Sequence, residues 1–191
     1  MIDIKEILYT FAALFAIIDV TGSIPIVINI KHHGMAVKPL QISVICFLVM
    51  ALFLIGGEKF LSGANIDMHG FAVAGAIILL VYAFEMTLGV HIIKNDECPQ
   101  GTSAIIPLVF PLYAGAGALT TVIAMRTEYA MVNILIAVAL NTVIIYFFLK
   151  YIDKLEKIIG PQIIYIITKI LGIVLLAMAS KMFVVNLKAL L

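Results

Sequence analysis

The sequence has few charged residues. Asp, Glu, Lys and Arg make up 12% of its 191 positions, against about 25% in soluble domains, and hydrophobic residues make up 64%. A soluble fold of this length could not bury so much apolar surface. The composition therefore excludes a soluble protein and predicts a polytopic membrane protein in contact with the lipid bilayer, with no room for a separate soluble domain.

Cysteines and basic clusters are scarce as well. Cys46 and Cys98 are far apart in the chain, which supports neither a disulfide framework nor a metal site. Blocks rich in Lys and Arg are absent and the formal net charge is +1, so we expect no nucleic-acid partner. A cleavable signal peptide is not indicated, because the first apolar run contains Asp19 and lacks a small-residue cleavage site. We expect this run to stay as a membrane span.

Nearly uncharged runs of about 17–25 residues divide the chain into six expected spans. They cover about 7–30, 40–57, 70–90, 105–125, 129–149 and 161–185. Each is expected to be helical, because lipid cannot satisfy the open edge of a sheet and the alternating pattern of barrel strands is absent. The loops after the first, third and fifth runs hold six lysines, against four basic residues on the other side. The positive-inside rule therefore predicts that both termini face outward.

The second half of the sequence resembles the first half. At an offset of 95, Gly22 coincides with Gly117, and at an offset of 96, Met86 coincides with Met182. Chance matching between apolar segments is the alternative, but the two offsets agree within one residue in separate spans. Because each half holds three spans, the second half must enter the membrane upside down, as in many secondary transporters.

This pattern predicts an all-α membrane protein of six transmembrane helices, arranged as two inverted-topology three-helix repeats. The first repeat would cover 1–95 and the second 96–191, and both would belong to one integral membrane domain. Helices one and four are expected to be broken near the middle of the bilayer. The first run contains Gly22 and Pro25, and the fourth contains Pro111, Gly115 and Gly117. Proline removes a backbone donor and glycine permits non-helical angles.

Broken spans at matching places in two halves are the best sequence indication of a transporter binding site, although close helix packing is the alternative. The freed N–H groups would hold a carboxylate and the freed carbonyls an ammonium group or a cation. Asp19 would accept the substrate ammonium or exchange a coupling proton, with a structural helix cap as the alternative. The other candidate substrate-binding residues supply backbone approach, hydroxyl groups or an amide: Thr21, Gly22, Ser23, Gly115, Gly117, Thr120, Thr121 and Asn141. The hydroxyls are equally plausible as bonds to their own helix, and Asn141 as an interhelical bond.

The same residues carry a resemblance to a known family. The Asp-x-x-Gly-x-x-Pro from Asp19 to Pro25 resembles the first-span signature of the MarC family of integral membrane proteins. The family's fourth-span signature is matched by a second pattern in this chain, Pro107-x-x-x-Pro111-x-x-x-Gly115-x-Gly117-Ala118-x-Thr120-Thr121, which resembles it. The similarity covers essentially the whole chain, with Val20 and Ala116 where the family commonly has proline. The resemblance implies an inner-membrane protein of six spans in two inverted repeats, in a family that includes transporters of small neutral amino acids such as glycine and alanine.

The leading hypothesis is a secondary transporter of a small amino acid that works by alternating access. No catalytic residue, metal site or cofactor is expected, and a proton and a sodium ion remain alternatives for the coupling ion. An intramembrane enzyme is disfavoured, because a second deep acid and a buried histidine are missing from the spans. The remaining alternative is a scaffold or assembly factor, which a structure with Gly22 and Gly117 apart and no cavity between them would favour. Homo-oligomer formation is left open.

Overall fold

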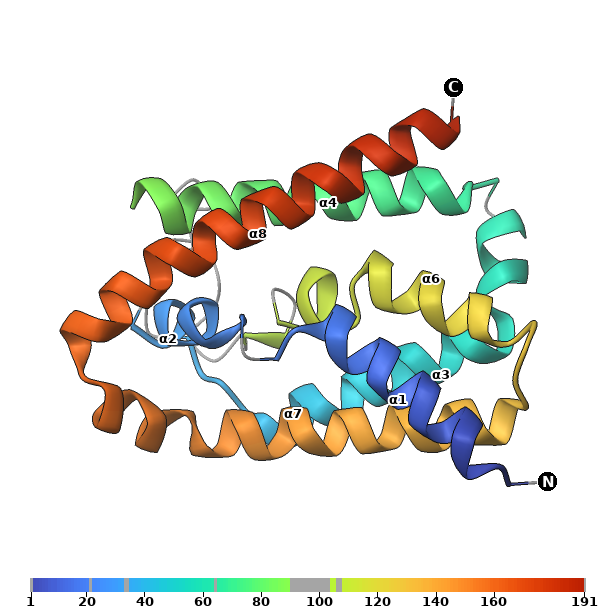
Figure 1. Ribbon diagram of the computed structural model, residues 1–191, viewed down its shortest axis with the longest axis horizontal. Coiled ribbons are helices and arrows are strands. Elements are labelled where there is room, and N and C mark those ends of the chain that lie inside the picture. The colour runs from blue at the N-terminus through green and yellow to red at the C-terminus, as the bar shows by residue number, and fades with distance from the viewer. Residues whose placement is uncertain are drawn as a thin grey trace.

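The computed structural model describes residues 2–20, 22–32, 35–63, 65–89, 104–105 and 108–190. Within these ranges the regular structure is entirely helical, as the sequence predicts. The elements are α1 (Ile4–Ile18), α2 (Ile24–His32), α3 (Pro39–Gly63), α4 (Met68–Leu88), η1 (Leu108–Tyr113), α6 (Ala116–Met125), α7 (Met131–Ile159) and α8 (Pro161–Leu190). The long helices run along the long axis of the molecule (Figure 1).

Four helices of the described part are long and apolar enough to cross a membrane. They are α3, α4, residues Met131–Ile158 of α7 and residues Tyr165–Leu190 of α8. The 25 residues of α3 extend about 37 Å at about 1.5 Å per residue, which exceeds the hydrocarbon core of about 30 Å. The outer faces of these four helices expose large apolar side chains, such as Leu52 of α3 and Ile170 of α8, which suits contact with lipid. The apolar helix α6 is shorter.

Two helices continue beyond the ends that the sequence predicts. The second and fifth apolar runs were expected to end near Gly57 and Leu149, where charged residues begin, but α3 continues to Gly63 and α7 to Ile159. The charges end the apolar run without ending the helix, because Glu and Lys are good helix formers. Each helix is therefore longer than its membrane-crossing part.

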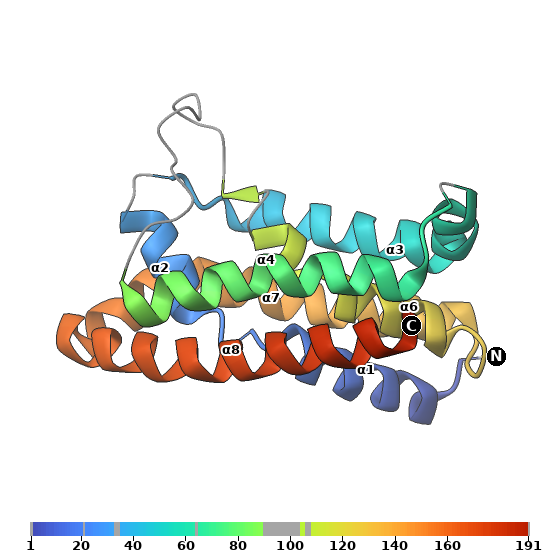
Figure 2. The same ribbon diagram turned by 90° about the horizontal axis from the view of Figure 1, so that it is seen from above.

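Both termini lie at the same end of the bundle (Figures 1 and 2). The connections between α3 and α4 and between α6 and α7 lie at this end too, and the connection between α7 and α8 lies at the opposite end. The chain thus runs back and forth along the bundle.

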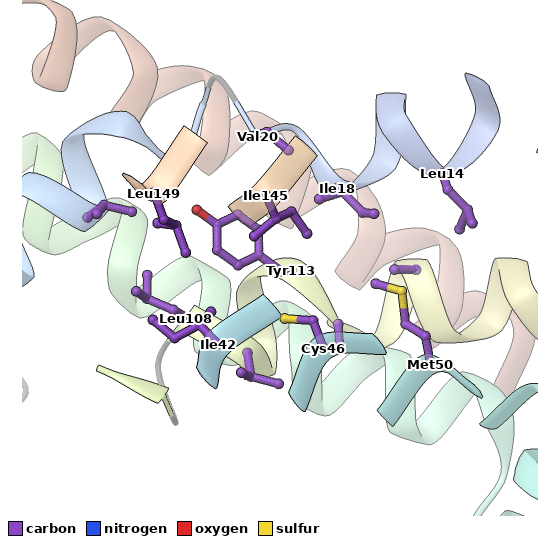
Figure 3. Close-up of a cluster of buried hydrophobic side chains, with 14 of the residues drawn as sticks. Leu14, Ile18, Val20, Ile42, Cys46, Met50, Leu108, Tyr113, Ile145 and Leu149 are labelled. Carbon is purple, nitrogen blue, oxygen red and sulfur yellow. The ribbon is translucent and has the colours of Figure 1, made fainter. Parts of the chain in front are cut away.

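The helices of the first half pack against those of the second half. The principal contacts join α3 to α7, α4 to α8, and α1 to both α6 and α7. The buried core includes Leu14, Cys46, Met50 and Ile145 (Figure 3). Small residues permit the closest approach of α4 to α6, since a Cβ at Gly75 would lie 2.9 Å from the Cβ of Ala116.

The first and fourth apolar runs are broken where the sequence predicts. Helix α1 ends at Ile18, Asp19 adopts a left-handed conformation with φ 43°, and α2 begins at Ile24. In the fourth run, Phe110 is extended within η1, with φ −126° and ψ 124°. Gly115 is extended again, with φ −71° and ψ 171°, and α6 follows it. These two breaks position the candidate site.

Candidate functional site

Asp19 lies at the first break, where its side chain holds the chain as it leaves α1. Its backbone N–H donates to the carbonyl of Phe15 at 3.2 Å, and its Oδ1 accepts from the N–H of Gly22 at 3.1 Å. A Cβ at position 22 would overlap the Asp19 carboxylate, so the carboxylate can keep this position only with glycine there. The cap that was the alternative role of Asp19 is therefore present, and the half-buried carboxylate also faces a cavity.

A buried hydrogen bond connects the first break to the second. The Ser23 hydroxyl oxygen lies 2.8 Å from the Tyr113 phenol oxygen, and Ser23 Oγ also donates to the carbonyl of Val20. Because a serine hydroxyl has one proton, Tyr113 is the donor in the first of these bonds. Both side chains are fully buried, and the Tyr113 ring lies among Ile18, Val20 and Ile145 (Figure 3). This contact fixes the end of η1 against the turn that follows α1.

A cavity of about 260 Å³ lies where the two breaks meet. One side consists of the first break and the end of α1, and a second side consists of the first turn of α6. The third side is a face of α8, and α4 and η1 contribute one lining residue each. The lining residues are Ala16, Ile17, Ile18, Asp19, Gly22, Ser23, Leu79, Leu112, Ala116, Gly117, Ala118, Leu171, Val174, Leu175, Met178, Ala179 and Met182.

The structure brings four of the predicted site residues together at this cavity: Asp19, Gly22, Ser23 and Gly117. Thr21 lies outside the described residues. Gly115 is buried directly before α6 and is not one of the described lining residues.

The remaining three candidates make other contacts. The hydroxyls of Thr120 and Thr121 donate to the carbonyl of Gly117 at 3.0 and 2.8 Å, which is the bond to the same helix that was one alternative for them. The Asn141 amide donates to the carbonyls of Phe11 at 3.3 Å and Ala137 at 3.0 Å. It therefore joins α7 to α1, as an interhelical bond would, and it lies outside the described cavity lining.

Basic side chains hold the two ends of the bundle. Lys31, near the end of α2, forms an ion pair with Asp153 of α7. At the opposite end, where α6 finishes (Figure 1), Nη1 of Arg126 donates to the carbonyls of Leu54 at 3.1 Å and Ile55 at 2.9 Å in α3. Each contact joins the end of a broken run to a long helix of the other half.

The wall that α8 contributes to the cavity and the role of Lys169 were not predicted from the sequence. The ammonium of Lys169 donates to the carbonyl of Thr87 at 2.9 Å, in the last turn of α4. A cation there compensates the negative end of the α4 dipole. A lysine within a predicted span was the available signal, but only the structure identifies its acceptor.

Together these features define an integral membrane protein whose two broken helical segments meet at a small cavity beside a carboxylate. Residues 4–191 match the sequence profile described as MarC family integral membrane protein, and the chain belongs to this family. This confirms the resemblance seen in the two helix-break motifs.

Relatives of similar length support the assignment. The UPF0056 membrane protein of Pyrococcus horikoshii is 30% identical over 196 residues, covering 97% of this chain and 96% of the relative. The UPF0056 membrane protein of Aquifex aeolicus is 29% identical, covering 95% of this chain and 92% of the relative. A UPF0056 membrane protein of Buchnera aphidicola subsp. Schizaphis graminum is 25% identical, covering 99% of this chain and 95% of the relative. No solved structure matches the chain significantly.

Proposed function

We propose that the chain is a secondary transporter of small neutral amino acids that works by alternating access. The cavity between Gly22 and Gly117 carries the proposal, because it lies where two helix breaks meet and beside the carboxylate of Asp19. Discontinuous helices that meet at a cavity form the substrate sites of many transporters. A scaffold or assembly factor needs no such cavity, so the transport hypothesis is favoured over that alternative.

The two charged ends of an amino acid have complementary groups in this cavity. The carboxylate of Asp19 would accept the substrate ammonium. The substrate carboxylate would lie at the start of α6, where Ala116, Gly117 and Ala118 line the cavity. N–H groups in the first turn of a helix have no intrahelical acceptor, and Gly115, the N-cap, has no side chain to cap them. The positive end of the helix dipole adds attraction for an anion.

We also propose that the chain consists of two inverted repeats of three spans, 1–95 and 96–191. Helix α1 ends at Ile18 and η1 at Tyr113, which are 95 positions apart, in agreement with the sequence offset. The helix contacts support the proposal, since α3 packs on α7 and α4 packs on α8, and in each pair the second helix is the expected counterpart of the first. The packing of α1 on α7 likewise has its counterpart in that of α6 on α3.

The basic contacts at the two ends follow the same symmetry. Lys31 and Arg126 are 95 positions apart, as are Asp153 and Glu58, which lies one turn beyond Ile55 in α3. In an alternating-access cycle, rocking of the two halves would weaken one of these contacts while strengthening the other. In an inner membrane, both termini would face outward and the Lys31 end would face the cytoplasm.

Counterflow in proteoliposomes tests the proposed function. Vesicles that contain the purified chain and are loaded with unlabelled alanine or glycine should accumulate the labelled amino acid transiently. Loaded vesicles without the protein should not. Absence of accumulation with every neutral amino acid, from chain that is folded and correctly inserted, would contradict the proposal.

A further inference from the structure

One wall of the cavity is apolar and belongs to one face of α8. Its residues recur at intervals of three and four positions, which places them on one side of the helix. They are Leu171, Val174, Leu175, Met178, Ala179 and Met182. From Leu171 to Met182 this face extends about 16 Å at about 1.5 Å per residue. Leu79 of α4 and Leu112 of η1 continue the apolar surface.

The polar groups of the cavity belong to the two helix breaks and not to α8. The carboxylate of Asp19, the hydroxyl of Ser23 and the backbone near Gly22 and Gly117 belong to the two helix breaks. Among the described lining residues, Asp19 is the one ionisable side chain. The cavity is thus divided into a polar part for the two charged groups of an amino acid and an apolar part for what is attached to its Cα.

We propose that the α8 wall is the side-chain subsite of the transporter and that it selects aliphatic and thioether side chains over glycine. This inference rests on the proposed function. It extends the preference of the same site from the smallest neutral amino acids to those with larger apolar side chains, namely valine, leucine and methionine. The close packing around Gly22 and Gly117 limits space at the polar part of the cavity only. The flexible side chains of Met178 and Met182 can adapt to apolar groups of different shape.

The size of the cavity and the solvation of its walls favour substrates with aliphatic or thioether side chains. Glycine would leave the apolar wall unoccupied, whereas each methylene group buried against it raises affinity by about fourfold. The cavity volume of about 260 Å³ lies below the range of about 300–1,000 Å³ typical of drug-sized ligands, which suits a single amino acid. Acidic and basic side chains would be buried against the apolar wall without a charged partner, which is unfavourable.

Competition for counterflow tests the subsite. Uptake of labelled alanine into alanine-loaded vesicles is measured with increasing unlabelled glycine, valine, leucine, methionine, aspartate or lysine outside. Leucine and methionine are expected to compete at concentrations at least about tenfold below that of glycine. Aspartate and lysine are expected to compete more weakly than glycine.

Two variants of α8 make the test specific. Met178 lines the cavity and is 44% exposed, so Met178→Trp can be accommodated while filling the apolar part. It should weaken competition by leucine at least tenfold and leave glycine competition within about threefold. Ile173, on the same helix, is 58% exposed and lies outside the described lining, so Ile173→Trp should change neither. Met178→Ala shortens the same side chain and should also weaken competition by leucine more than competition by glycine. It keeps the subsite testable if the Trp variant does not fold.

The possible failures are distinguishable. Alanine exchange that glycine inhibits at least as well as leucine would overturn the subsite and leave the transport function standing. Equal leucine competition in Met178→Trp, Met178→Ala and Ile173→Trp would also overturn it. Absence of exchange for every amino acid in the unmodified chain would overturn the proposed function, and the subsite with it.

Discussion

The phenol oxygen of Tyr113 lies 2.8 Å from the hydroxyl oxygen of Ser23, and this buried bond joins two helix breaks that are 90 residues apart in the chain. It connects the two broken segments directly. Neither side chain is exposed, so a loss of the bond has no compensation from solvent. The bond therefore stabilises the side of the cavity that carries Asp19.

Replacing Tyr113 by phenylalanine should destabilise the protein by about 0.5–1.5 kcal/mol, because the ring remains and one buried hydrogen bond is lost. The midpoint of thermal unfolding in detergent measures this effect. Tyr165→Phe is the matched control, since Tyr165 is exposed on α8. Equal midpoints for the two variants would show that the Ser23–Tyr113 bond contributes nothing to stability.

Asp19→Asn should lower exchange about tenfold or more while the protein stays folded. The amide oxygen can still accept from the N–H of Gly22, but the charge that would bind the substrate ammonium is lost, and hydrogen bonds to charged groups contribute about 1.5–3 kcal/mol. Asp67→Asn is the control, because Asp67 caps α4 far from the cavity and asparagine caps equally well. Initial counterflow rates compare the two variants, and unchanged exchange in Asp19→Asn would remove Asp19 from the substrate site.

Gly22→Ala should abolish most of the exchange, because the new Cβ would displace the Asp19 carboxylate from its position at the cavity. Gly56→Ala provides the contrast: it lies within α3 with no atom near the added methyl group, and alanine there should stabilise the helix by about 0.5–1 kcal/mol. Counterflow and thermal unfolding are measured for both. If Gly22→Ala exchanges at the unmodified rate, the turn geometry at Asp19 does not matter for transport.

Charge reversal tests the contact between α2 and α7. Lys31→Glu places two acids opposite each other and should change the exchange rate, by about fivefold at most because Asp153 is largely exposed and such pairs contribute up to about 1 kcal/mol. The double variant Lys31→Glu with Asp153→Lys restores opposite charges and should return the rate toward that of the unmodified chain. A double variant no closer to the original rate than the single one would exclude a role for this ion pair in the cycle.

The helix breaks and part of the site could be predicted because their signals are local. Gly22 and Pro25, or Pro111 and Gly115, disfavour a continuous helix whatever surrounds them. By contrast, α8 is apolar on most of its surface, so periodicity alone cannot identify the face that turns toward the cavity. That face is identified only once α4 has packed against α8 and the cavity has formed between α8, the first break and the start of α6.

Individual polar residues were harder to assign than the breaks. A threonine in a helix can bind a ligand or its own backbone, and for Thr120 and Thr121 the carbonyl of Gly117 is within reach without any tertiary contact. The partner of Tyr113 could not be predicted, because the bond to Ser23 depends on how two distant breaks meet. Such contacts depend on tertiary packing and not on sequence spacing.

Accessibility of the cavity from each side of the membrane tests alternating access most directly. Ala118 lines the cavity, so Ala118→Cys can be introduced into a chain in which Cys46 and Cys98 are replaced, and the vesicles can be treated with a membrane-impermeant maleimide from outside or from inside. We predict that the thiol reacts from both sides and that substrate slows both reactions. Reaction from neither side, or rates that no amino acid alters, would contradict a transport pathway through this cavity.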